Sequence, residues 1–185
     1  SKPAVPVHIR SLNKDGATYG VAMPIIIYFN QEITDGATFA KTATVKVNGA
    51  PATGAWYFEA SGAPNEKIEA HYRPQHFWPA QSAIAVNLPM QGLSAGAGMV
   101  YDDSLTLNFQ IGDEHLTTVD GNTETMTVTD NGAPKFKFAV SLGKAKTPSY
   151  TGTKVVMELD KIQHMVGTPD DPYSLQVPWS VRLTN

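Results

Sequence analysis

The chain has 185 residues, which is enough for one large or two small domains. Its composition, 42% hydrophobic and 17% charged, excludes a disordered chain, and its formal net charge of −3 provides no basic field for phosphates, so no nucleic acid partner is expected. The sequence has no apolar run near the ~20 residues that cross a bilayer, and it has no cysteine to serve as a nucleophile or in a disulfide.

Residues 1–112 show the pattern of an immunoglobulin-like β-sandwich. The 15 glycines and 13 prolines are spread along the chain, as in proteins made of many short strands joined by turns. The clearest strand is predicted at 105–111, where apolar and polar residues alternate. Further strands are predicted at 24–29, 44–47, 56–58, 68–72 and 83–88. About seven short strands favour the sandwich, without the Cys…Trp…Cys pattern of antibody domains.

Two segments interrupt these strands. Residues 34–41 are expected to form one helical turn with Thr34 as its N-cap. Residues 73–80 contain two prolines and are expected to form an ordered corner that buries Phe77 or Trp78.

A second β domain is expected over residues 113–185, with the boundary at Gly112-Asp113-Glu114. The Asn131-Gly132 pair lies between alternating segments and predicts a hairpin turn. Strands are predicted at 116–120, 125–129, 135–142 and 155–157. The fold class is therefore all-β, with one β domain following another.

The titratable residues do not suggest a metal or cofactor site. The five histidines are dispersed, and none shows the spacing of a shared metal site. Adjacent acids lie at turns, where they cannot face a substrate from opposite sides as a glycosidase pair does. The histidines are His8, His71, His76, His115 and His164.

A set of short segments, taken in order along the chain, resembles the actinobacterial L,D-transpeptidases. In that family an immunoglobulin-like module precedes a catalytic domain of the YkuD type. The matching segments include Tyr72-Arg73-Pro74, Phe77-Trp78-Pro79-Ala80, Gly96-Ala97-Gly98-Met99, Val140-Ser141-Leu142-Gly143-Lys144, Thr147-Pro148, His164-Met165, Tyr173 to Trp179 and Val181-Arg182-Leu183-Thr184.

The resemblance implies an exported enzyme, at the cell wall or anchored on the outer face of the membrane. Such an enzyme forms 3-3 cross-links between peptidoglycan stem peptides through a cysteine acyl-enzyme, which carbapenems and other β-lactams trap, and it needs no cofactor. The family's nucleophile lies in a Ser-His-Gly-Cys motif downstream of the Arg-Leu-Thr segment, whereas this sequence ends at Asn185. The chain is therefore expected to be a fragment without catalytic residues, inactive alone; the alternative is descent from an enzyme that lost its active site.

The resemblance also implies substrate-binding residues. Residues 161–173 correspond to the family's lid over the donor and acceptor channels, Tyr173 matches a tyrosine that lines the pocket, and His164 and Met165 are candidates beside it. The alternative is a polar surface loop with a solvent-exposed imidazole.

Two expectations concern the packing of the second domain. Met157 and Trp179 are expected in its core, as apolar residues on alternating strands usually are. Residues 177–183 are expected to present an unpaired strand edge, with dimerisation, disorder or edge pairing (self-association) there. The alternative function is a non-catalytic cell-wall spacer or peptidoglycan-binding module, which the absent cysteine favours.

Overall fold

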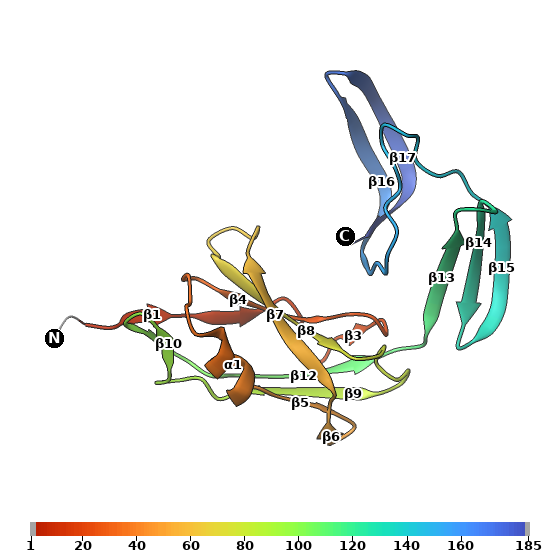
Figure 1. Ribbon diagram of the computed structural model, residues 1–185. Helices are drawn as coiled ribbons and strands as arrows, with labels where there is room; N and C mark the ends of the chain where they lie inside the picture. The colour runs from red at the N-terminus through yellow and green to blue at the C-terminus, as the bar shows by residue number, and fades with distance from the viewer. Residues whose placement is uncertain (1–2, 184–185) are drawn as a thin grey trace. The chain divides into compact units, whose positions relative to one another are not determined.

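The structure is a computed structural model that describes residues 3–183, and it is an all-β protein with one short helix (Figure 1). The chain divides into two compact units, Ser1–Val140 (unit 1) and Ser141–Asn185 (unit 2). The all-β prediction is confirmed. In the described part of the chain, no helix has the length and apolar character to cross a bilayer.

Unit 1 contains the sheets of the sandwich. The five-stranded sheet has the order β3 (Thr18–Tyr19), β12 (Leu105–Ile111), β9 (Ala83–Leu88), β5 (Thr44–Val47) and β6 (Ala50–Pro51). The four-stranded sheet has the order β2 (Ile9–Ser11), β4 (Ile25–Phe29), β8 (Ile68–Pro74) and β7 (Gly54–Ala60). A small third sheet contains β1 (Val5–Val7), β11 (Met99–Tyr101) and β10 (Ser94–Gly96).

The core of unit 1 forms because alternating residues of its strands point inward. In β12 the inward side chains Leu107, Phe109 and Ile111 are buried, while the residues between them are exposed. The predicted corner at 73–80 is also present. Trp78 is buried and its indole Nε1 donates to the carbonyl oxygen of Met23 (2.7 Å), whereas Phe77 is exposed.

The helix α1 (Gly36–Thr42) confirms the helical turn predicted at 34–41, but its N-cap lies one residue later than predicted. Asp35, not Thr34, is the N-cap, because its carboxylate accepts from the backbone N–H (3.0 Å) and the hydroxyl (2.6 Å) of Thr38. The hydroxyl bond, followed by the backbone bond, lowers the pKa of Asp35. The backbone N–H groups of Thr34 and Asp35 both donate to the carbonyl oxygen of Ala95, which lies in β10.

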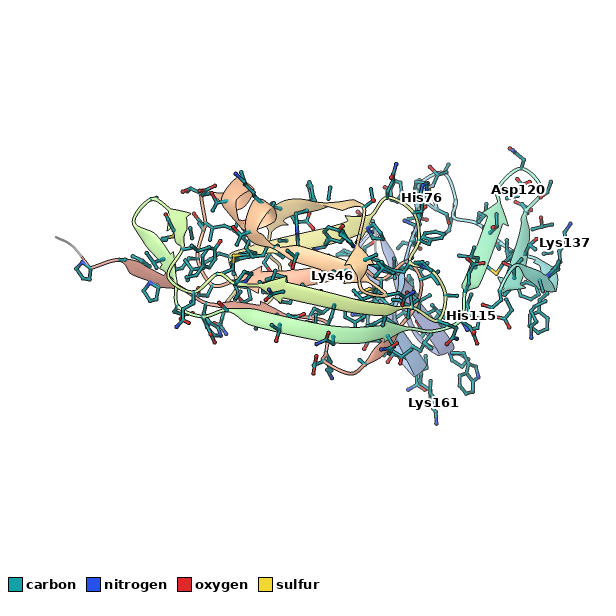
Figure 2. The ribbon with its side chains drawn as sticks, turned by 90° about the horizontal axis from the view of Figure 1, so that it is seen from below. Lys46, His76, His115, Asp120, Lys137 and Lys161 are labelled. Carbon is teal, nitrogen blue, oxygen red and sulfur yellow. The ribbon has the colours of Figure 1, made fainter. Side chains whose placement is uncertain are left out.

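The strands β13 (His115–Asp120), β14 (Thr125–Asp130) and β15 (Ala133–Ala139) form an antiparallel meander. The predicted Asn131-Gly132 turn joins β14 to β15, with φ of 46° and 78°, as a type I′ hairpin requires. The sheet carries polar side chains on its surface, among them Asp120 and Lys137 (Figure 2). This sheet lies in unit 1, so the predicted domain boundary at residues 112–114 stays a prediction.

Asp113 holds the connection between β12 and β13. Its Oδ1 accepts from the Gln81 side chain (2.8 Å) and from the Asn131 side chain (3.2 Å). Asn131 in turn accepts from the backbone N–H of Glu114 (2.9 Å). The hydrogen bond from Gln81 to Asp113, followed by that from Asn131, lowers the pKa of Asp113 below its ordinary value.

Unit 2 is a long two-stranded hairpin, β16 (Val156–Thr168) and β17 (Asp171–Leu183), preceded by irregular chain. Among its described residues only Val155 is a buried hydrophobic residue. Trp179 is 75% exposed, so the prediction that it lies in a core is wrong, and Met157 is only half-buried. Within residues 3–183, β17 pairs with β16 alone, which agrees with the expected unpaired edge; Thr184 of the matched Arg-Leu-Thr segment lies outside the described residues.

Candidate functional site on the hairpin of unit 2

The three predicted substrate-binding residues lie near the turn of the β16–β17 hairpin. His164 and Met165 are on β16, and Tyr173 is on β17. The predicted lid, 161–173, comprises the end of β16, a two-residue turn and the start of β17. This segment is therefore regular hairpin rather than an irregular loop. That it covers a substrate channel stays a prediction.

The strand register separates the three residues onto two faces. Met165 pairs with Leu175, and His164 pairs with Gln176. Because neighbouring residues of a strand point to opposite faces, His164 and Met165 lie on different faces of the hairpin. Tyr173, two residues before Leu175, shares the face of Met165. The structure thus brings Met165 and Tyr173 together and leaves His164 on the other side.

Gly167 gives Tyr173 its position. A Cβ atom at Gly167 would collide with the backbone oxygen of Asp171 and would lie 2.6 Å from Cδ1 of Tyr173. The ring therefore covers a position that only glycine can occupy. A salt bridge between Lys144 and Asp171 (3.6 Å) connects the turn of the hairpin to the preceding irregular chain.

His164 and Ser174 form a hydrogen-bonded pair on the other face. The Nε2 atom of His164 lies 2.8 Å from Oγ of Ser174. A serine nucleophile needs such a base, which a third group orients. Within residues 3–183 no carboxylate contacts His164, and both side chains are exposed. The pair can hold a polar ligand, but it lacks the parts of a serine triad.

The hairpin exposes many large apolar side chains. They lie on both faces of the hairpin, and exposed apolar surface of this amount is typical of interaction sites. The chemistry available on the hairpin is therefore apolar contact, supplemented by hydrogen bonds from His164 and Ser174. The exposed apolar residues are Val156, Leu159, Ile162, Met165, Val166, Tyr173, Leu175, Trp179, Val181 and Leu183.

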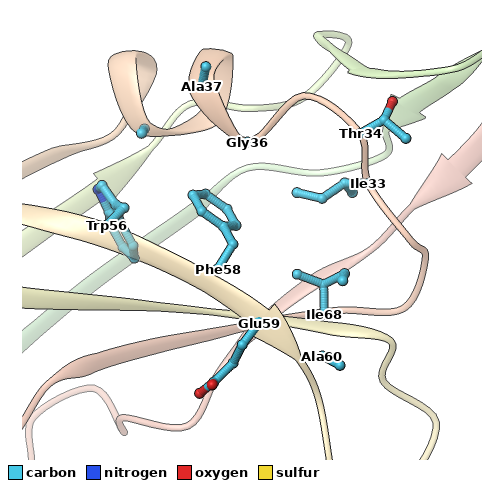
Figure 3. A pocket seen from close by; sticks show the side chains of 10 residues that line it. Ile33, Thr34, Gly36, Ala37, Trp56, Phe58, Glu59, Ala60 and Ile68 are labelled. Carbon is cyan, nitrogen blue, oxygen red and sulfur yellow. The ribbon is translucent and has the colours of Figure 1, made fainter.

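A groove of about 440 Å³ lies in unit 1, between α1 and β7. Its lining is mainly apolar and includes Ile33, Ala37, Trp56 and Phe58. Figure 3 shows Phe58 directed toward the helix, whereas the carboxylate of Glu59 is directed away from it. Glu59 of β7 is also among the lining residues, but because its carboxylate is directed away, the groove offers mainly apolar contact.

One cluster of potential metal ligands in unit 1 was not predicted from the sequence. The carboxylates of Glu59 and Glu69 and the imidazole of His71 have ligand atoms within 4.8 Å of one another. The spacing of Glu69 and His71, two residues apart on a strand, was the available signal, because such residues share a face. Glu59 joins them only through the pairing of β7 with β8, which the sequence does not reveal.

Comparisons with known proteins cover both units. Residues 1–94, just over half of the chain, match the bacterial Ig domain family. L,D-transpeptidase 2 of Mycobacterium tuberculosis (strain CDC 1551 / Oshkosh) is 31% identical over 179 residues, which cover 92% of this chain and 42% of that protein.

Solved structures of L,D-transpeptidases are also similar to this chain. An L,D-transpeptidase from Mycobacterium smegmatis superposes with a TM-score of 0.71 at 25% identity, over 97% of this chain and 77% of that one. An LD transpeptidase in complex with imipenem superposes with a TM-score of 0.76 at 23% identity, over 98% and 77% of the two chains, which supports the fold.

The sandwich and these matches define a protein with an immunoglobulin-like module. The chain belongs to the bacterial Ig domain family, and its relatives across both units are L,D-transpeptidases. The predicted resemblance to L,D-transpeptidases with an immunoglobulin-like module is thus confirmed. The chain spans 42% and 38% of the length of two curated relatives.

Proposed function

We propose that these 185 residues are part of an L,D-transpeptidase that forms 3-3 cross-links between peptidoglycan stem peptides outside the cytoplasm. The observation that carries the proposal is the 31% identity to L,D-transpeptidase 2 over 179 residues, which extends through both compact units. A match confined to the immunoglobulin-like module would support only a shared accessory domain.

The proposed chemistry is acyl transfer through a cysteine thiolate. A thiolate attacks the donor peptide, forms an acyl-enzyme and releases the leaving group, and the acceptor amine then resolves the intermediate. Since the sequence has no cysteine, the thiolate must come from residues other than these 185. The hairpin would contribute binding: Met165 and Tyr173 present apolar surface to a stem peptide or a β-lactam, and one structural neighbour is itself in complex with imipenem.

Imipenem acylation measured by intact-mass spectrometry tests the proposal. The 185-residue chain should show no adduct, whereas the product of the whole natural reading frame should gain one imipenem per molecule at a cysteine. Replacing Tyr173 by Ala in the longer product should slow acylation by roughly tenfold, because an apolar contact of about 1.5 kcal/mol is lost. If the protein encoded by the whole natural reading frame contains no cysteine and forms no adduct, the enzymatic proposal is refuted.

A second candidate is a non-catalytic wall-associated spacer or peptidoglycan-binding module. The completeness of the sandwich core favours it, since Val7 to Ile111 supply a continuous cluster of buried side chains without help from unit 2. Retention of the chain on purified peptidoglycan, compared with an unrelated β-sandwich, tests the binding. Equal retention of the two proteins would remove this candidate as a binding module.

A further inference from the structure

A compact cluster of metal-ligating side chains lies on the four-stranded sheet of unit 1. Glu59 on β7 stands directly opposite Glu69 on β8, and His71 follows Glu69 on the same face. The Nε2 atom of His71 lies 2.8 Å from Oε1 of Glu69 and 3.5 Å from Oε1 of Glu59. Glu59 also lines the apolar groove, but Figure 3 shows its carboxylate directed away from the helix.

The charges of this cluster are not balanced by a fixed cation. Like charges directly opposite each other on paired strands are destabilising. Among the described residues neither Glu59 nor Glu69 forms a salt bridge with a lysine or arginine. The neighbouring Arg10 pairs with Glu66 and stacks on the ring of Tyr28, 4.3 Å from its centroid. A cation held between the two carboxylates would therefore relieve their repulsion.

The cluster also has the spacing and support of a coordination site. Ligand atoms about 2.1 Å from a tetrahedral zinc ion lie roughly 3.4 Å apart, which the two measured separations from His71 Nε2 bracket. The hydroxyl of Ser61 donates to Oε2 of Glu69 (2.8 Å) and accepts the backbone N–H of Ala63 (3.1 Å). Such an outer hydrogen bond orients a carboxylate ligand. Glu69 and His71 are also largely buried, with side-chain exposures of 18% and 13%.

We propose that Glu59, Glu69 and His71 bind a divalent transition-metal ion, with Zn²⁺ as the best fit. One imidazole nitrogen and two carboxylate oxygens form a donor set that zinc accepts, and the fourth position is left for water. Because the ligands come from both β7 and β8, the ion would hold these strands together. The proposal concerns unit 1 alone and is independent of any transpeptidase activity.

Isothermal titration calorimetry of the metal-free chain with ZnCl₂ near neutral pH tests the site. One ion per chain is expected to bind, and it should raise the thermal midpoint because it binds the folded state. His71→Gln and Glu59→Gln should each weaken zinc binding by about tenfold or more, and Ser61→Ala by about tenfold through the outer hydrogen bond. Because Glu59 is exposed, its substitution should leave the fold intact. The Glu59 variant therefore still tests the site if the His71 variant unfolds.

The matched control is His8→Gln. His8 also pairs with a carboxylate, that of Asp102 (3.2 Å), but has no second acid ligand among the described residues. This variant should bind zinc as the unaltered chain does. Absence of zinc binding would overturn the proposal. Zinc binding that is unchanged in both the His71→Gln and the Glu59→Gln variants would also overturn it, as would loss of zinc binding in the His8→Gln variant.

Discussion

Gly96 is a position in unit 1 where a single added methyl group should destabilise the fold. Its φ of +88° is unfavourable for any other residue, and a Cβ would collide with Oγ1 of Thr34. Gly96→Ala should cost about 3 kcal/mol of unfolding free energy. The control is Gly98→Ala, which has a similar φ of +76° but open space around it and should cost about 1 kcal/mol. Urea unfolding measures both, and equal losses would show that the contact with Thr34 is unimportant.

Asn13 is a buried polar side chain that completes two backbone groups. Its side chain donates to the carbonyl oxygen of Pro24 (3.1 Å) and accepts from the N–H of Ile26 (2.9 Å). Asn13→Ala should therefore destabilise the chain by about 2 to 3 kcal/mol, since both groups lose their partner inside the protein. Asn30→Ala, which removes an exposed bond to the N–H of His8, should cost less than about 1 kcal/mol. Similar losses in thermal or urea unfolding would contradict this assignment.

These residues show the limit of local sequence signals. Asn, Asp and Thr favour both turns and helix caps, so Asn13 and Thr34 could be placed near turns but not given partners. The carboxylate of Asp35 is the cap, and the backbone N–H of Thr34, like that of Asp35, is in a hydrogen bond to the carbonyl oxygen of Ala95. That bond joins segments about sixty residues apart, and no local pattern contains it.

At the scale of elements, strands were predictable where one face is buried. The alternation at 105–111 and the Asn131-Gly132 turn each identify an element from adjacent residues, and the structure contains both. Cross-strand neighbours were not predictable, because register depends on pairing between distant segments. The opposite faces of His164 and Met165 could be expected from alternation alone, but the bond from His164 to Ser174 could not.

The Asp113 connection should make the β12–β13 junction sensitive to acid. In the folded state the pKa of Asp113 is lowered from its ordinary value of 3.8. The ionised carboxylate therefore stabilises the fold above pH 3.8, and this stabilisation is lost as the pH falls through the lower pKa of the folded state. Asp113→Asn keeps an acceptor but has no charge, so its stability should change less than that of the unaltered chain between about pH 6 and about pH 2. Urea midpoints across this range measure the difference. Parallel curves for the two proteins would refute the contribution of Asp113.

Across the whole chain, apolar burial is distributed very unevenly. Unit 1 contains a continuous core from Val7 to Ile111, whereas unit 2 is a hairpin with Val155 as its buried hydrophobic residue among those described. An isolated two-stranded hairpin is marginally stable in water. Hydrogen exchange should therefore be much faster in 156–183 than in β4 or β12, because local opening costs little where few apolar contacts are made. Comparable protection in the hairpin and the sandwich strands would contradict this expectation.

Self-association through the hairpin is the prediction for the molecule in solution. Leu159 and Trp179 are 73% and 75% exposed, and the outer edges of β16 and β17 lack strand partners within residues 3–183. Burying such side chains contributes about 1.5 to 3 kcal/mol each. Sedimentation velocity at micromolar concentrations should show dimers or larger species, and Leu159→Lys with Trp179→Lys should weaken association by about a hundredfold, because two apolar contacts are lost. Val119→Lys, at an exposed apolar position on β13, is the control and should leave association unchanged. A chain that stays monomeric, or a double variant that associates as strongly as the unaltered chain, would show that the hairpin surface does not drive assembly.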